Sequence, residues 1–372
     1  MSPSLRNPAE GTGQIERAAE IISNAENPII LAGNGVVRAK ASEALAHFSE
    51  TLGIPVANTF MAKGVIPNAH PLSLGTVGLQ AHDYVACGFD RADLVICVGY
   101  DMIEYHPHLW HKNSDSQIIH IDAMPADVDT HYQLATGVLG DINAGLEEIS
   151  KLTGAHQTNK FETLRDTLSD VMEEHAHDES FPVKPQKILW DLREAMNKED
   201  ILISDVGAHK MWVARMFQAE QANTCIVSNG FASMGIGVPG AVAAKLVHPE
   251  RNIVTVTGDA GFLMNSQEIE TAMRLNLPIV ILVWNDGEYG LIKWHQQRTF
   301  GRESNIRFNN PDLVAYAKSF GAKGYRIEST DQLLPTLKQA FEDNTVVVID
   351  CPVDYRENMK LTEQLGELVC PI

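Results

Sequence analysis

Two stretches in the second half of the sequence, RNIVTVTGDAG at residues 251–261 and LPIVILVWNDG at residues 277–287, give the strongest indication of a fold. Each is a continuous apolar run that ends in an acidic residue among glycines, just before a predicted helix. Strands that are apolar on both faces and alternate with helices are typical of a parallel sheet that helices cover on both sides. These stretches therefore predict a parallel α/β domain.

The same alternation of strands and helices extends over the rest of the chain. Short apolar runs bounded by turn residues predict further strands at residues 28–32, 54–60, 92–99, 117–122, 201–207 and 346–353. Amphipathic periodicity predicts helices at residues 39–52, 266–275 and 332–342. The predicted fold class is therefore α/β, with two tandem doubly wound parallel-sheet domains.

A polar and acidic segment divides the chain in two. Residues 154–185 are poor in apolar side chains, which is typical of a solvated helix and a linker. We therefore expect a Rossmann-like domain at residues 1–152, a linker at 153–185 and a second α/β domain at 186–372.

The composition indicates a globular protein, and the net charge disfavours some classes of binding partner. The 372 residues are 44% hydrophobic and 21% charged, which excludes a disordered or fibrous chain. With 29 basic and 48 acidic residues the net charge is −19, which disfavours nucleic acid and anionic membrane surfaces as partners. There is no apolar run of membrane-spanning length, no signal-peptide core and no paired spacing among the five cysteines, so we expect a cytoplasmic protein with free thiols.

The strand ends in the second half carry residues suited to binding a ligand. Ligands bind beyond the carboxyl ends of the strands in open parallel sheets. Asp259 and Asp286 each follow an apolar strand, beside glycines and a helix start that can meet an anion. Either residue alone would be read as a helix cap or a turn residue. Together, at neighbouring strand ends, they predict a Mg²⁺ ion that joins carboxylates to a diphosphate, although the spacing leaves the cofactor unidentified.

The segment GDAGFLMNSQEIETAMRLNLPIVILVWNDGEYG, residues 258–290, resembles the thiamine-diphosphate signature, which begins Gly-Asp-Gly and ends in Asn-Asn or Asn-Asp. SDVGAHKMW (204–212), SNGFASMGIGVPGA (228–241) and PIILAGNGV (28–36) resemble segments of acetolactate synthase. GYDMIEYHP (99–107) and VDYREN (353–358) are similar to its catabolic, FAD-independent branch. The resemblance extends from about residue 14 to residue 369. It implies that residues 1–152 are the central domain and residues 186–372 the diphosphate-side cofactor domain.

The resemblance also implies a role for individual residues. Mg²⁺ would be held by the side chains of Asp259 and Asp286 and by the backbone carbonyl of Glu288. The cofactor-binding residues would be Gly207, Ala208, His209, Met234, Ala260, Gly261, Glu288, Tyr289 and Gly290. Met234 would press the cofactor into its bent shape. Taken without the resemblance, Met234 would be a core methionine and His209 a capping or surface histidine.

The activity that the resemblance implies is a carboligation. The enzyme would use thiamine diphosphate and Mg²⁺ to decarboxylate pyruvate and to condense it with a second 2-oxo acid, giving acetolactate, and it would be a homo-oligomer. Two alternatives stay open: a 2-oxo-acid decarboxylase, and a non-catalytic cofactor-binding subunit of a split enzyme.

Three departures from the family pattern qualify this interpretation. Ala260 replaces a glycine of the signature, which requires a negative φ at that position. His295 stands where biosynthetic relatives carry a substrate-selecting Trp, and Trp294 comes one position early, which leaves the acceptor open. No segment matches the pyrimidine-binding domain, which supplies the activating glutamate in this family. We therefore assign no catalytic residue in this chain, and we expect activity to need a pyrimidine domain, in trans or from a longer polypeptide.

The first half offers only a weak nucleotide motif. Gly33-Asn34-Gly35 follows a predicted strand, but there is no third glycine at the expected spacing, which disfavours dinucleotide binding. Residues 99–104 are acidic and apolar, without the arginine that often accompanies a flavin diphosphate in relatives. FAD is therefore not expected.

Overall fold

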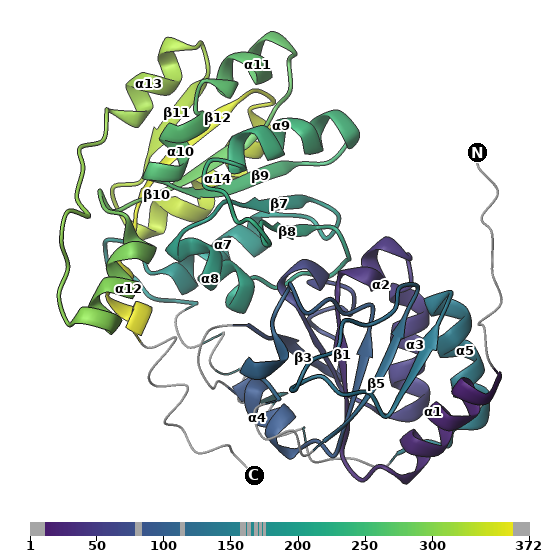
Figure 1. Cartoon of the computed structure of the whole chain (residues 1–372). Coiled ribbons are helices and arrows are strands. Elements are labelled where there is room, and N and C mark those ends of the chain that lie inside the picture. The colour runs from purple at the N-terminus through teal and green to yellow at the C-terminus, as the bar shows by residue number, and fades with distance from the viewer. Residues whose placement is uncertain are drawn as a thin grey trace. The chain divides into compact units, whose positions relative to one another are not determined.

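The computed structural model describes residues 12–78, 84–111, 116–156 and 176–359, and the single positions 161, 165, 166, 170 and 173 (Figure 1). The described residues form two compact units. The first contains the described residues before position 170 together with Ala219–Asn223, and the second contains Asp170–Gln218 and the rest from Thr224 onward. The finer domain bounds, with a linker at residues 153–185, stay a prediction, since much of that segment lies outside the described residues.

The first unit contains a six-stranded parallel sheet in the order β3-β2-β1-β4-β5-β6. Its strands are β1 (Pro28–Ala32), β2 (Val56–Asn58), β3 (Ser73–Thr76), β4 (Leu94–Val98), β5 (Gln117–Asp122) and β6 (Thr136–Leu139). Its helices are α1 (Thr12–Asn24), α2 (Asn34–Arg38), α3 (Ser42–Leu52), α4 (Tyr84–Arg91) and α5 (Ile142–Leu152), with 3₁₀ turns η1 (Phe60–Ala62) and η2 (Pro107–Leu109). In Figure 1, α1, α3 and α5 lie on one face of this sheet and α4 on the other. This is the strand order of doubly wound folds, which reverses between β1 and β4.

The second unit contains another six-stranded parallel sheet, in the order β11-β12-β10-β9-β7-β8. Its strands are β7 (Ile201–Ser204), β8 (Cys225–Val227), β9 (Ile253–Gly258), β10 (Val280–Asn285), β11 (Lys323–Arg326) and β12 (Val347–Pro352). Its helices are α7 (Pro185–Ala195), α8 (Ala208–Met216), α9 (Gly237–Val247), α10 (Asp259–Asn265), α11 (Glu268–Arg274), α12 (Gly290–Phe300), α13 (Leu313–Ser319) and α14 (Leu333–Glu342), with η3 (Thr330–Gln332) and η4 (Tyr355–Met359). Figure 1 shows α9, α11 and α13 on one face and α7, α8 and α14 on the other. The predicted class, two doubly wound parallel α/β domains, is confirmed.

The register of the second sheet brings the two predicted metal ligands to one edge. β9 and β10 are neighbours, and Trp284 pairs with Gly258 across them. Asp259 and Asn285 are the residues that come next on these strands, so Asp259 and Asp286 follow adjacent strand ends. Both strands are buried except at their last residue. β10 is apolar on both faces up to that residue, whereas one face of β9 carries the buried Thr255 and Thr257.

The sequence analysis missed the four edge strands, β3, β6, β8 and β11. Each is only three or four residues long and has at least one partly or fully exposed position. β3, β6 and β11 contain polar residues or glycine, and the apolar run of β8 is only three residues long, so none gives the longer apolar run by which the other strands were predicted. The helix predicted at residues 39–52 was also wrong at its start. A short helix, α2, comes first, Lys40 adopts a positive φ of 53°, and α3 begins only at Ser42.

Within the described part of the chain, no helix has the length and apolar character needed to cross a membrane. Cys97, Cys225 and Cys351 are buried, and none of the three forms a disulfide bond among the described residues.

Candidate functional site

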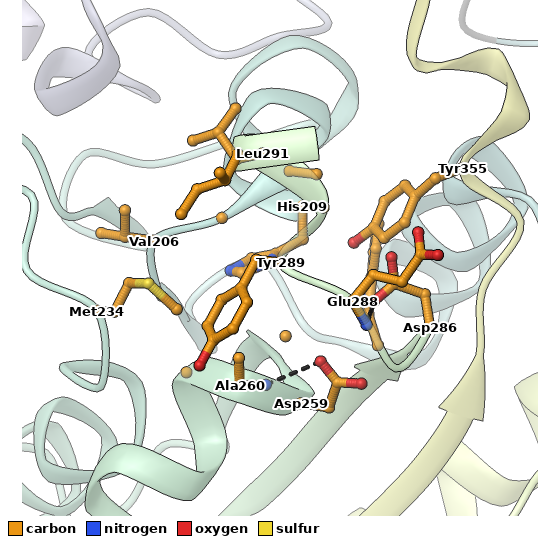
Figure 2. Close-up of a pocket in the computed structure, with 17 residues that line it drawn as sticks. Val206, His209, Met234, Asp259, Ala260, Asp286, Glu288, Tyr289, Leu291 and Tyr355 are labelled. Carbon is orange, nitrogen blue, oxygen red and sulfur yellow. Dashed lines mark hydrogen bonds between the residues drawn. The ribbon is translucent and has the colours of Figure 1, made fainter. Parts of the chain in front are cut away.

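One pocket of about 500 Å³, measured with its open mouth, lies at the carboxyl ends of β7, β9 and β10 (Figure 2). The residues predicted to bind the cofactor or the metal all line it: Gly207, Ala208, His209, Met234, Asp259, Ala260, Gly261, Asp286, Glu288, Tyr289 and Gly290. Further lining residues are Val206, Gly258, Trp284, Leu291, Ile292 and Tyr355. The structure thus brings the predicted residues together, while their roles stay predictions.

Asp259 is a buried carboxylate that three donors hold in one orientation. Its Oδ2 atom accepts hydrogen bonds from the backbone N–H of Gly287 at 2.7 Å and from Asn310 Nδ2 at 2.6 Å. Its Oδ1 atom accepts one from the backbone N–H of Ala260 at 2.8 Å, which Figure 2 marks. Burial raises the pKa of Asp259, and these hydrogen bonds only partly offset that effect.

Asp286 is less well satisfied. It accepts one hydrogen bond, at 3.2 Å, from the backbone N–H of Glu288. Burial, and secondly the charge of Asp259, raise the pKa of Asp286 to about 7. A buried and a partly buried carboxylate that repel each other in this way form a set of oxygen atoms suited to a hard divalent cation.

The side chain of Glu288 is engaged elsewhere. Its carboxylate pairs with Lys293 Nζ at 2.5 Å and with Arg307 Nε at 3.0 Å. Burial acts to raise its pKa, but these two hydrogen bonds outweigh it and the pKa lies below the usual range. This leaves the backbone carbonyl of Glu288 as its available oxygen, in keeping with the predicted role.

Among the described residues, no group of three or more His, Cys, Asp or Glu side chains is placed to hold a metal ion. The predicted set contains only two carboxylates and one carbonyl. Magnesium prefers six oxygen ligands, which it completes with water and with the phosphate oxygens of a bound ligand. The residues present therefore fit a cation that binds together with a diphosphate.

The turn after β7 forms another wall of the pocket. His209 is buried, and its ring lies 6.2 Å from that of Trp284. Burial lowers the pKa of His209 to about 4, so the imidazole is neutral near pH 7. Its Nε2 atom is buried without a partner among the described residues. Gly207 leaves room for this ring, because a Cβ atom there would lie 2.7 Å from His209 Cε1.

Ala260, which replaces a glycine of the signature, has the backbone conformation that a residue with a side chain requires. It lies in the first turn of α10 and is not among the residues with positive φ. The methyl group is therefore compatible with the backbone at that position.

Two residues that shape the site were missed. Asp205, buried at the end of β7, accepts hydrogen bonds from the N–H of Gly235 at 2.9 Å and from Thr257 Oγ1 at 3.0 Å. Asp205 thereby connects the loop next to Met234 with β9. Its position in the sequence, directly after an apolar strand, was a signal that could have identified it. Asn310 lies in the loop before α13, and no spacing in the sequence connects it to Asp259.

A second pocket, of about 930 Å³ with its open mouth, adjoins the first. Asp286, Glu288, Gly290 and Tyr355 line both pockets; Lys293, Trp294, Gln297, Val353, Arg356 and Asn358 line only the second. Trp294 is buried, whereas His295 is exposed and lines neither pocket.

The glycines of the Gly33-Asn34-Gly35 turn are explained by backbone packing. A Cβ atom on Gly33 would lie 2.4 Å from the carbonyl oxygen of Gly99, and one on Gly35 would lie 2.5 Å from its Cα. The N-terminus of α2 is occupied by Glu104, whose carboxylate accepts a hydrogen bond from the N–H of Asn34 at 2.9 Å. The same carboxylate accepts a second one from the hydroxyl of Thr59. The N-terminus of α2 is thus capped by a side chain of the first unit itself.

Comparison with known proteins identifies the class. Residues 205–351 match the family described as "Thiamine pyrophosphate enzyme, C-terminal TPP binding domain" and residues 15–149 the one described as "Thiamine pyrophosphate enzyme, central domain". The chain therefore belongs to the thiamine pyrophosphate (thiamine diphosphate) enzymes, as its signature segment predicted.

Its relatives include acetolactate synthases. The chain is 35% identical over 368 residues to "Acetolactate synthase" of Bacillus subtilis (strain 168), covering 95% of this chain and 64% of that protein. It is 32% identical over 377 residues to "Acetolactate synthase, catabolic" of Raoultella terrigena, covering 98% and 66%. It is also 32% identical over 367 residues to "Probable acetolactate synthase large subunit" of Methanocaldococcus jannaschii, covering 95% and 62%. The chain thus spans less than two thirds of the length of each of these relatives.

Proposed function

We propose that this chain forms the metal- and diphosphate-binding part of a thiamine-diphosphate-dependent carboligase, which decarboxylates pyruvate and condenses it with a second 2-oxo acid to give acetolactate. The observation that carries the proposal is the pocket shared by Asp259, Asp286 and the turn at Gly207–His209, at the ends of adjacent strands. The names of the relatives support the product.

In this proposal the cofactor, when bound, supplies the carbon nucleophile and the electron sink of the reaction. The protein residues bind and orient it. Asp259, Asp286 and the carbonyl of Glu288 hold Mg²⁺, and the Mg²⁺ neutralises the diphosphate. Gly207, Ala208, His209, Ala260 and Gly261 line the diphosphate, and Tyr289 and Gly290 close the wall next to Glu288.

Met234 lies on the other side of the pocket from Asp286 (Figure 2). An apolar side chain in that place can press on the middle of a bound cofactor while the metal fixes its diphosphate end. The acid–base group at the pyrimidine ring would come from a pyrimidine-binding domain, in cis or in trans, and two such halves would meet in a homo-oligomer.

We further propose that the first unit works without FAD, because residues 99–104 are acidic and apolar and Glu104 places a carboxylate at the N-terminus of α2. The three buried cysteines, which form no disulfide bond among the described residues, are in keeping with a cytoplasmic protein.

Isothermal titration of the protein with thiamine diphosphate, with and without Mg²⁺, tests the core of this proposal. We expect stoichiometric binding that requires Mg²⁺ and is lost in Asp259→Ala. The matched control is Asp141→Ala, which removes a carboxylate that caps α5 in the other unit and should leave binding unchanged. Binding of equal strength in Asp259→Ala would refute the proposal.

A further inference from the structure

A series of side-chain hydrogen bonds leads from the protein surface to the carboxylate of Asp259. Asn310 Nδ2 donates to Asp259 Oδ2 at 2.6 Å and to Asn285 Oδ1 at 2.9 Å. Asn285 Nδ2 donates to Asp350 Oδ1 at 2.8 Å, and Arg326 Nε donates to Asp350 Oδ2 at 2.9 Å. The series therefore crosses the sheet from β11 through β12 to the end of β10.

The orientation of both amides in this series follows from Asp350. An ionised carboxylate can only accept hydrogen bonds, so Asp350 requires the NH₂ group of Asn285. The Oδ1 atom of Asn285 must then point toward Asn310 and requires an NH₂ group there. Arg326 Nε donates to the other oxygen of Asp350, which is buried, so both oxygens of this carboxylate act as acceptors.

Asn310 is consequently held with its NH₂ group toward Asp259. Its Oδ1 atom is buried and has no partner among the described residues, so the side chain is held from its NH₂ end. With Gly287 and Asn310 both donating to Oδ2 of Asp259, rotation of that carboxylate is restricted. Its Oδ1 atom accepts the N–H of Ala260 at 2.8 Å, and a carboxylate oxygen has a second lone pair that can bind a further ligand.

We propose that Asn310 is a positioning residue for the metal ion and that Asp350 sets its orientation from the neighbouring strand. This rests on the proposed function, because it presupposes a divalent cation at Asp259. Partners that orient a metal ligand typically change metal affinity by about 10–100-fold when they are removed. A residue that only stabilises the loop would change the unfolding temperature and leave metal affinity unchanged.

Two substitutions separate these possibilities. Asn310→Leu removes the donor while keeping a similar volume. Asp350→Asn is isosteric and lies farther from the pocket. The new amide can donate a hydrogen bond to Asn285. The side chain of Asn285 can then turn over and present its NH₂ group to Asn310. Asn310 must then turn its oxygen toward Asp259, where two acceptors repel.

The matched control is Asn252→Leu. Asn252 Nδ2 donates to Asp200 Oδ2 at 3.1 Å, so this variant breaks an Asn–Asp hydrogen bond of the same kind beside the amino end of β9, opposite the pocket. It is expected to lower the unfolding temperature without changing metal binding.

The experiment measures Mn²⁺ binding to the full chain by the loss of the free-ion electron paramagnetic resonance signal, with thiamine diphosphate in excess, alongside thermal unfolding. We expect affinity to fall about tenfold or more in Asn310→Leu and in Asp350→Asn, and by less than about twofold in Asn252→Leu. Wild-type affinity in Asn310→Leu, or an equal loss in Asn252→Leu, would overturn the inference while the proposed function stands. Absence of Mn²⁺ binding to the wild-type protein would overturn both.

Discussion

Burial and the neighbouring charge of Asp259 raise the pKa of Asp286 to about 7, far above the usual value for an aspartate. A carboxyl group whose pKa is raised on folding stabilises the protein fully only below its unfolded pKa, and this contribution is lost as the pH rises through the folded pKa. For Asp286 this pH window runs from the ordinary aspartate pKa of 3.8 to a pKa of about 7. In the metal-free protein, repulsion between the two carboxylates therefore destabilises the folded state most above pH 7. A divalent cation can relieve this repulsion.

The first prediction concerns the pH dependence of the metal-free protein. In the presence of a chelator, the wild-type unfolding temperature should fall between about pH 4 and pH 7 relative to that of Asp286→Asn, because over this range the folded aspartate keeps a proton that the unfolded one has lost, whereas the amide carries no charge. Differential scanning calorimetry at several pH values over this range measures the difference, and titrating groups remote from the site cancel in the comparison. Parallel curves for the two proteins would show that the pKa of Asp286 is not raised in the folded state.

The second prediction separates the two metal ligands. Asp259→Ala should abolish Mg²⁺-dependent binding of thiamine diphosphate, because one of the two anchoring carboxylates is lost. Asp286→Asn should retain much of the binding, since an amide oxygen can still coordinate Mg²⁺. Intrinsic tryptophan fluorescence is a suitable signal, because Trp284 lines the pocket. An equal loss in both variants would contradict the assignment of Asp286 as an exchangeable oxygen ligand.

The third prediction tests the turn after β7. Gly207→Ala should weaken cofactor binding about tenfold or more, because the new Cβ atom would lie 2.7 Å from His209 Cε1 and must displace that ring. Gly154→Ala is the control, since nothing lies within 4 Å of a Cβ atom there. Cofactor titration of both variants at saturating Mg²⁺ decides the point. Unchanged affinity in Gly207→Ala would mean that the His209 ring can move without consequence for the ligand.

The fourth prediction is that the purified protein is colourless and does not bind FAD. Glu104 places a carboxylate on the N–H of Asn34, at the helix end that a diphosphate would need. Absorbance at 450 nm after dialysis against FAD, followed by desalting, measures any retained flavin. A stoichiometric yellow chromophore would show that Glu104 can leave this position.

Much of the site could be predicted because it follows from strand order. The apolar runs before Asp259 and Asp286 predict parallel strands, and the ends of such strands share one edge of the sheet. Ala260, Gly261, Glu288, Tyr289 and Gly290, which the family resemblance added, line the same pocket, and their roles stay predictions. The edge strands could not be read in the same way, because β11 has no buried residue and gives no apolar run.

The supporting residues were harder to predict for a physical reason. Asn310 reaches Asp259 from a loop, across 51 positions of sequence, and only the folded chain shows their hydrogen bond. The Gly33-Asn34-Gly35 turn is a different case, because here the sequence shows a motif that the structure explains without a ligand. It resembles part of a nucleotide-binding motif, yet its glycines are needed because the backbone at Gly99 passes too close for a side chain.

The fifth prediction concerns activity and carries the most risk. In the proposed function the residues of the pocket serve the metal and the diphosphate, and the acid at the pyrimidine ring would come from a pyrimidine-binding domain. General acid–base catalysis at such a step is typically worth about 10²–10⁴-fold, and the loss of orientation lowers the rate further. The 372-residue polypeptide alone should therefore form no measurable acetolactate from pyruvate, Mg²⁺ and thiamine diphosphate.

Adding the pyrimidine-binding domain of a close relative, fused or in trans, should restore part of the activity. Asp259→Ala with the same domain is the control, because it keeps the added acid and removes the metal anchor; it should stay inactive. Release of acetaldehyde without acetolactate would favour a 2-oxo-acid decarboxylase instead. Robust turnover by the polypeptide alone would mean that one of its own residues acts as the acid at the pyrimidine ring. The carboxylates at the pocket would then be the first to test, with Glu288→Gln compared against Asp286→Asn.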